Sequence, residues 1–312
     1  MSLEACLPAE LRGPTTTITR IAAGLSGAGV YRVDAAGQAF VLKVASESEA
    51  LVDWRRRLHI QELAAKAGLG PRVIHVDDAS RAVVTAFVVD RSFPAFYFDP
   101  RTREAALAQL GRTVRRVHEL PLPSDADASN PRELLAAVWS ELASFAVPVF
   151  VGEAVQRALT EEPPALERAL VLSHNDVNPS NVIYDGEQVL LLDWNAAGKN
   201  DPFYDLAAIS IFLRMDEGTC QRLLAAYDGQ PSTLSSRFWY TRRLVAALCG
   251  ATFLRLARDS GHAGAAGETL DSTPSLGDFY QRMRAGLLSP ATGEGQWWFG
   301  LALVKAGVVP PG

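Results

Sequence analysis

The sequence predicts an α+β protein with two lobes, on the basis of three observations. The chain has 312 residues, a length that suggests two domains or lobes. Up to about residue 89, short runs of branched apolar residues alternate with turns, which is typical of strands. From residue 90 onward, apolar residues recur mostly at helical spacing. We therefore expect residues 1–89 to form a small antiparallel sheet with one main helix, and residues 90–312 to form a larger, mostly helical lobe.

The composition excludes several classes of protein. Hydrophobic residues make up 48% of the chain and charged residues 21%, as in ordinary globular proteins. The formal net charge of -5 provides no basic surface for nucleic acid. The first residues lack the basic region and apolar core of a signal peptide, and no run reaches the roughly 20 apolar residues of a membrane helix. We expect a cytoplasmic protein with no nucleic-acid or membrane partner.

The three cysteines agree with a cytoplasmic location. Cys6, Cys220 and Cys249 lie far apart in the chain and lack the spacing of metal ligands. Three is also an odd number, so they cannot all pair within one chain. Reduced thiols of this kind suit a reducing compartment.

The N-terminal lobe is predicted to contain five strands and one helix. The strands cover residues 15–21, a segment that ends near residue 33, and residues 39–45, 72–76 and 82–89. The helix covers residues 48–67 and is stopped by the sequence Gly-Leu-Gly-Pro that follows it. The last strand would lead into the connection between the lobes.

Two features of this lobe are suited to binding phosphate. A glycine-rich turn between the first two strands contains Gly24, Ser26 and Gly27, and such turns let backbone N–H groups approach phosphate oxygens closely. A plain hairpin would also explain the glycines. Lys43 lies inside the apolar strand 39–45 and is one of only four lysines in the chain. It would supply a compact positive charge to a phosphate, unless it is an edge-strand lysine that faces water.

The C-terminal lobe is predicted to be built from helices around one loop. Helices are expected at residues 102–120, 132–145, 152–159, 205–214, 219–227, 236–259, 275–288 and 296–306. The connector at residues 261–274 is rich in Gly, Ala and Thr and is expected to be a mobile loop that could cover a substrate.

The most informative stretch is SHNDVNPSN at residues 173–181, which we predict to be a loop. Asp193 lies twelve residues past Asn181, at the end of a second apolar run. An Asp-Gly dipeptide between two apolar runs predicts a hairpin, which would bring Asp193 back beside Asn181. Asp176 would then offer a carboxylate that can accept a proton. Asn181 and Asp193 would offer the oxygen ligands that Mg²⁺ takes together with substrate phosphates.

Two chemical interpretations of this loop differ in how they use the histidine. Phosphoryl transfer needs a carboxylate that faces the attacking hydroxyl and metal ions that neutralise phosphate charge. A hydrolytic metal site could instead be built from His174, Asp176 and Asp193. The hydrolytic interpretation gives no role to the glycine-rich turn or to Lys43, so phosphoryl transfer is favoured.

The order of these motifs resembles a known family. The pattern His-x-Asp-x-x-x-x-Asn, followed by a strand that ends in Asp, resembles the catalytic and metal-binding loops of kinases. In detail it is most similar to the aminoglycoside phosphotransferase and choline kinase family. The segment NDPFYDLA at residues 200–207 resembles that family's segment after the metal-binding Asp. The resemblance implies a bilobal, protein-kinase-like fold and ATP- or GTP-dependent phosphorylation of a hydroxyl group on a small molecule.

The resemblance also implies a role for each matching residue of the loop. Asp176 would be the catalytic base, and Asn181 and Asp193 would be the Mg²⁺ ligands. His174 and Asp205 would brace the loop rather than react.

On the nucleotide side, the resemblance implies that Lys43 contacts phosphate and that Glu62, on the helix after the lysine strand, orients it through an ion pair. Glu49 is the next candidate for this pair, and so is Glu47. The backbone near Phe87 and Val88 would contact the adenine edge.

The acceptor is left open by the sequence. Asn195 stands where bacterial choline-kinase-like relatives often have Glu, which places a choline assignment in doubt. Acidic and basic residues are nearly balanced after residue 198, so the sequence does not indicate a strongly acidic pocket that would attract polycationic aminoglycosides. Six aromatic residues could form a cage for a quaternary ammonium or could be core residues; they are Trp239, Tyr240, Phe279, Tyr280, Trp297 and Trp298. A catalytically silent nucleotide-binding protein of the same fold is the second hypothesis, and the joint presence of the four site residues favours an active enzyme.

Overall fold

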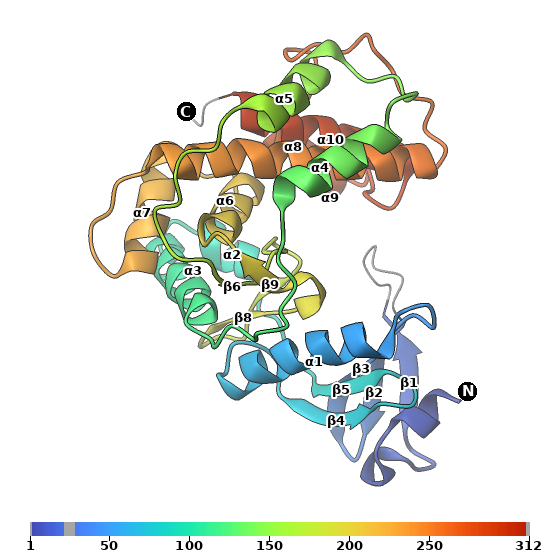
Figure 1. The fold of residues 1–312 in the computed structure, drawn as a ribbon. Coiled ribbons are helices and arrows are strands. Elements are labelled where there is room, and N and C mark those ends of the chain that lie inside the picture. Colours follow the sequence, from blue (N-terminus) through green and yellow to red (C-terminus); the bar gives the residue numbers. More distant parts are fainter. Residues whose placement is uncertain (1, 22–28, 310–312) are drawn as a thin grey trace.

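The computed structural model describes residues 2–21 and 29–309 and confirms the predicted fold class. A five-stranded antiparallel sheet with helix α1 (Leu51–Lys66) forms one end of the molecule, and helices form most of the remainder (Figure 1). The boundary predicted at residues 89 and 90 falls in the segment between strand β5 and helix α2. The two-lobe division at that position stays a prediction.

The sheet places Lys43 at its centre. Its strands are β1 (Thr17–Arg20), β2 (Gly29–Ala35), β3 (Gln38–Val44), β4 (Val73–Asp77) and β5 (Ala82–Ala86), in the order β1-β2-β3-β5-β4. In β3, Lys43 pairs with Val30 on one side and Val83 on the other. The interpretation of Lys43 as an edge-strand lysine is therefore wrong.

Each face of the sheet is covered by a different part of the chain. The N-terminal segment packs on one face, where Cys6, Leu7 and Leu11 join the strands in a buried cluster. On the other face, Trp54 and Leu58 of α1 pack against Val83. Their spacing of four residues puts both side chains on one side of the helix, which fixes how α1 lies on the sheet.

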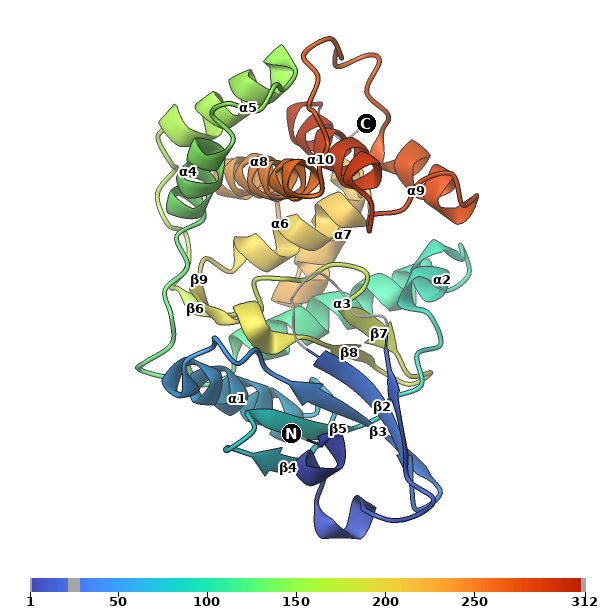
Figure 2. The same ribbon diagram turned by 90° about the vertical axis from the view of Figure 1, so that its right-hand side faces the viewer.

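The helices of the C-terminal part follow the predicted pattern with shifted ends. They are α2 (Phe93–Phe98), α3 (Arg103–His118), α4 (Pro131–Glu141), α5 (Val149–Thr160), α6 (Phe203–Phe212), α7 (Glu217–Asp228), α8 (Ser236–Asp259), α9 (Leu276–Arg284) and α10 (Gly293–Val308). Figure 2 shows α8 and α10 at the end opposite the sheet, with α6 and α3 between. Among the described residues, no helix is both long and apolar enough to cross a membrane.

Two short ladders frame the central loop between the sheet and these helices. The predicted hairpin is confirmed as β7 (Val182–Tyr184) paired with β8 (Val189–Leu191). A second ladder, between β6 (Val171–Ser173) and β9 (Gly198–Asn200), is not predicted by the sequence. Together the ladders fix both ends of the segment that runs from residue 174 to residue 197.

The connector at residues 261–274 has defined contacts with its surroundings. Gly264 forms a backbone bridge to Ala146, and the Lys305 ammonium donates to the carbonyl oxygen of Thr273 at 2.6 Å. Thr273 is buried. These contacts hold the connector against the helices near α4 and α10, and its predicted role as a cover over the substrate has no support in them.

Candidate active site

Asp176 is held in one orientation by two neighbouring amides. Its Oδ1 accepts from the Nδ2 of Asn178 at 2.9 Å, and its Oδ2 accepts from the Nδ2 of Asn181 at 2.7 Å. The residue is exposed, yet desolvation by the surrounding protein raises the pKa of its carboxyl, and the nearby charge of Asp193 acts in the same direction. A carboxylate with a raised pKa is a stronger proton acceptor than an ordinary aspartate.

His174 supports the loop through hydrogen bonds to its backbone and is not free to bind a metal. It is buried, and its Nε2 lies 2.9 Å from the carbonyl oxygen of Leu192, to which it donates. The Nδ1 then accepts from the backbone N–H of Asp176 at 3.3 Å. Burial lowers the pKa of His174, so the ring is neutral. Both ring nitrogens are engaged, which agrees with the bracing role that the resemblance implies.

The same contacts contradict the hydrolytic metal site. Over residues 2–21 and 29–309, no group of three or more His, Cys, Asp or Glu side chains is arranged to hold a metal ion. His174 is turned toward the backbone carbonyl of Leu192, so it cannot share a metal with Asp176 and Asp193. A metal at this loop would have to rely on oxygen ligands alone.

Asp205 fixes the backbone at the start of the loop. Its fully buried carboxylate accepts from the backbone N–H groups of His174 and Asn175, both at 2.8 Å, and lies 3.1 Å from the Nε2 of His118. Burial alone would raise the pKa of Asp205, but the contact with His118 and the other hydrogen bonds outweigh it and lower the pKa. Asn175 has a φ of 62°, a conformation that non-glycine residues rarely adopt. The buried carboxylate thus stabilises a strained backbone beside Asp176.

Lys43 and Asp193 link the sheet to the loop. The hairpin brings Asp193 back beside Asn181, because the N–H of Leu192 donates to the carbonyl oxygen of Asn181 at 2.8 Å. The Nζ of Lys43 lies 2.7 Å from the Oδ1 of Asp193. Asp193 itself has φ 59° and ψ 73°, so the chain turns sharply there. Both side chains are about a quarter to a third exposed and can be reached from solvent.

Asn181 and Asp193 each retain an oxygen atom of the kind that Mg²⁺ accepts as a ligand. Asn181 uses its Nδ2 toward Asp176, and Asp193 uses its Oδ1 toward Lys43. In the described structure this leaves Oδ1 of Asn181 and Oδ2 of Asp193 without hydrogen bonds. A pair of oxygen ligands is the protein contribution that Mg²⁺ takes when phosphate and water supply the other positions.

Comparison with known proteins decides the family. A model of the phosphotransferase enzyme family matches residues 17–239 of this chain. The chain belongs to this phosphotransferase family. The matched range includes Lys43, the loop at residues 173–181 and Asp205.

Solved structures with the same fold include several phosphotransferases. The choline/ethanolamine kinase family protein from Mesorhizobium loti has a TM-score of 0.62 and 22% identity, with 94% of each chain covered. Choline kinase LicA from Streptococcus pneumoniae has a TM-score of 0.59 and 15% identity, covering 87% of this chain and 92% of that one. Aminoglycoside-3'-phosphotransferase of type VIII has a TM-score of 0.57 and 23% identity, covering 76% of this chain and 95% of that one. At these identities the similarity establishes the fold.

A curated relative matches a shorter segment. Protein LicA of Haemophilus influenzae is 32% identical over 57 residues, which are 18% of this chain and 21% of LicA. The match therefore spans about a fifth of that protein's length.

The structure describes only some of the residues that are predicted to bind nucleotide. Gly24, Ser26 and Gly27 lie outside the described residues. The N–H of Phe87 donates to the carbonyl oxygen of Ala39 at 3.2 Å, so this amide is not free to contact adenine. The predicted adenine contact through Val88 stays a prediction.

The predicted ion pair between Lys43 and Glu62 does not form in this structure. Among the described residues, Glu62 makes no ion pair, and Lys43 pairs with Asp193. Gln61 rather than Glu62 lines the small cavity beside Lys43. Successive helix residues are rotated by about 100°, so Glu62 cannot face the same way as Gln61.

The six aromatic residues proposed for a cation cage are distributed over separate parts of the core. Tyr240 and Trp297 belong to one buried cluster and Phe279 to another, while Trp239 packs against a third. Trp297, Phe279 and Tyr240 are almost fully buried. They therefore act as core residues and do not form a common cage.

The charge of Asp176 influences two further ionisable side chains. Burial is the main cause that raises the pKa of the Tyr204 hydroxyl and raises that of the Cys249 thiol to about 12, and the charge of Asp176 adds to both effects. No sequence pattern indicates a site role for Tyr204 or Cys249.

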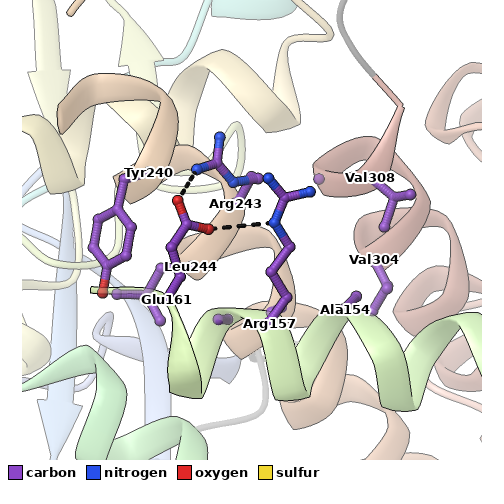
Figure 3. A pocket seen from close by; sticks show the side chains of 11 residues that line it. Ala154, Arg157, Glu161, Tyr240, Arg243, Leu244, Val304 and Val308 are labelled. Carbon is purple, nitrogen blue, oxygen red and sulfur yellow. Dashed lines mark hydrogen bonds and ion pairs between the residues drawn. The ribbon is translucent and has the colours of Figure 1, made fainter. Parts of the chain in front are cut away.

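A recess away from this loop lies among α5, α8 and α10 (Figure 3). Glu161 binds Arg157 at 3.3 Å and Arg243 at 2.6 Å, so its charge is matched within the protein. The cavity is about 30 Å³, enough for roughly one water molecule. It is too small for a nucleotide or a sugar.

Proposed function

We propose that this phosphotransferase moves the γ-phosphate of ATP or GTP to a hydroxyl group of a small molecule. The observation that carries the proposal is the position of Asp176, whose two carboxylate oxygens are held by Asn178 and Asn181 next to the Lys43–Asp193 pair. The backbone hydrogen bond from Leu192 to Asn181 brings these two sets of contacts together, which supports a proton acceptor, oxygen ligands and a cation acting at one site.

Asp176 acts as the base in this proposal. An acceptor hydroxyl placed against its carboxylate gives up its proton as the oxygen attacks the terminal phosphate. The amides of Asn178 and Asn181 keep the carboxylate aimed, and Asp205 keeps the backbone of the loop in place. Fixed orientation of a base toward its substrate is a large part of what catalysis requires in this reaction class.

Lys43, Asn181 and Asp193 bind the nucleotide phosphates in this proposal. Asn181 and Asp193 would hold Mg²⁺, which neutralises negative charge on the phosphates when it is bound. Lys43 exchanges its contact with Asp193 for a contact with phosphate. This exchange would release the Oδ1 of Asp193 from its contact with Lys43, so that Asp193 could hold Mg²⁺.

A screen for ADP or GDP release tests the proposal. The protein is incubated with Mg·ATP or Mg·GTP and a panel of small alcohols, including choline, sugars, amino alcohols and aminoglycosides. Release that depends on one acceptor, on Mg²⁺ and on Asp176 is the expected result. The Asp176→Asn variant is the matched control, because it preserves the size and polarity of the side chain and removes the base.

The catalytically silent alternative predicts a different outcome of the same experiment. A silent protein would bind Mg·ATP or Mg·GTP in calorimetry and release no ADP or GDP with any acceptor. Release at the same rate by the wild type and Asp176→Asn would contradict the assigned base.

A further inference from the structure

The cavity beside Lys43 contains a second cationic side chain. Lys43, Glu49, Arg57 and Asn195 all line one cavity of about 30 Å³, together with other residues of α1 and the sheet. Asn195 lies two residues after Asp193 in the chain. The cavity therefore lies next to the proposed phosphate and metal site.

The charges around this cavity form two ion pairs. Lys43 binds Asp193, and Arg57 binds Glu49. The Arg57 side chain is 32% exposed and that of Glu49 is 19% exposed, so the second pair is also reachable from solvent. Both cations are neutralised within the protein while no nucleotide is bound.

Helix α1 explains why an arginine faces Lys43. Trp54 and Leu58 pack on the sheet, and Arg57 and Gln61 flank them on the side of the cavity. Within α1 the residues that line the cavity include no carboxylate, and Glu49 comes from the segment before the helix. The cation at residue 57 is thus the group that α1 presents toward Lys43.

A nucleoside triphosphate stays anionic after one Mg²⁺ has bound to it. Once Asp193 binds the metal, Lys43 alone would balance only part of this charge. A guanidinium group can bind phosphate through two parallel N–H groups, which an ammonium group cannot do. Arg57 is placed to supply this second contact if it leaves Glu49.

We infer that Arg57 is a second phosphate-binding residue of the nucleotide site and that Glu49 competes with the phosphates of a nucleoside triphosphate for it. This inference rests on the proposed function. When the nucleotide binds, the Arg57–Glu49 pair opens as the Lys43–Asp193 pair does. The cavity of about 30 Å³ is too small for phosphates as it stands, so the inference requires both ion pairs to exchange partners before the phosphates contact Arg57.

Calorimetric titration of the intact protein tests the inference. Mg·ATP is the charged probe and adenosine is the uncharged probe. Arg57→Gln should weaken Mg·ATP binding by about tenfold or more, since a hydrogen bond to a charged group is worth about that much, and should leave adenosine binding unchanged. Arg57→Lys, which keeps the charge, should restore part of the loss.

Glu49→Gln should have the opposite effect and tighten Mg·ATP binding, because it frees Arg57 from its competitor. Damage to folding cannot produce this gain in affinity. Arg55→Gln is the matched control: Arg55 lies on the same helix, is 56% exposed and pairs with Asp78 instead. It should bind both probes as the wild type does.

Two results would overturn the inference alone while leaving the proposed function intact. In the first, Arg57→Gln binds Mg·ATP as tightly as the wild type does. In the second, Glu49→Gln weakens Mg·ATP binding, which would make Glu49 a partner of Lys43. A wild-type protein that binds no Mg·ATP or Mg·GTP would instead overturn the proposed function and this inference together.

Discussion

Replacing Asp205 by Asn should destabilise the protein by disturbing the catalytic loop. The carboxylate now accepts two backbone N–H groups at 2.8 Å, from His174 and Asn175, in a fully buried position. The side-chain amide that this substitution introduces would offer one oxygen and one NH₂ group in the same space. At least one backbone N–H would therefore face another donor.

The size of the effect follows from these contacts. An unsatisfied buried donor costs about 1–3 kcal/mol, and loss of charge from the remaining hydrogen bonds adds about 1 kcal/mol. The neutral side chain avoids the free-energy cost of burying a charge, which offsets part of this destabilisation. We expect Asp205→Asn to lower the free energy of unfolding by about 2–4 kcal/mol at pH 7, measured by urea denaturation.

The pH dependence gives an independent check. Because the folded-state pKa of Asp205 is lowered, its contribution to stability is fully present above the ordinary aspartate pKa of about 3.9 and is lost as the pH falls through the folded-state pKa. The difference between wild type and Asp205→Asn should therefore shrink below about pH 4.

The control for this experiment is Asp259→Asn, whose carboxylate is 52% exposed. It should change stability by no more than about 0.5 kcal/mol. A similarly small change for Asp205→Asn at pH 7, or a difference that stays constant into acid, would refute the role assigned to the buried carboxylate.

The other predictions concern the site itself. Asp176→Asn should lower kcat by about 10²–10⁴-fold while calorimetry still detects Mg·nucleotide binding; turnover near that of the wild type would show that Asp176 is not the base. Asp193→Asn should weaken binding of Mg·ATP more than binding of metal-free ATP, and equal losses would exclude it as a metal ligand. Lys43→Ala should lower turnover, Glu62→Ala should change it little, and the double variant should give the sum of the two free-energy changes. A coupling energy well above about 0.5 kcal/mol would mean that Lys43 and Glu62 meet when nucleotide is bound.

The sequence predicts the sheet and the hairpin because both follow from local rules. The strands of the sheet are marked by alternating residues and turns, and the β7–β8 hairpin is marked by the Asp-Gly dipeptide. By contrast, β6 and β9 have three residues each and pair across more than twenty positions of the chain. Such short strands carry no periodic signal, so only the tertiary structure reveals them. Helix α2 has six residues and is missed for the same reason.

The functional loop is predicted from spacing, but the contacts that support it are not. The spacing of Asp176, Asn181 and Asp193 indicates phosphoryl transfer, because the hairpin between the last two residues brings Asp193 back beside Asn181. The contact of His118 with Asp205 joins residues 87 positions apart, and no local pattern indicates it. The pairing of Glu62 with Lys43 stays a prediction: in this structure Lys43 pairs with Asp193, and Gln61 is the neighbouring residue of α1 that lines the cavity beside Lys43.

The ion pairs around Lys43 give the nucleotide site a specific energetic property. In the structure without nucleotide, the proposed metal ligand Asp193 is neutralised by Lys43, and Arg57 is neutralised by Glu49. A metal-free nucleotide can attract both cations but leaves two carboxylates close to its phosphates without partners. Mg²⁺ removes this repulsion at Asp193 but not at Glu49. If nucleotide binds as proposed, Glu49 would limit the affinity for Mg·nucleotide. The expected gain from Glu49→Gln and the expected loss from Asp193→Asn would then have one cause, the pairing of carboxylates and cations around the phosphates.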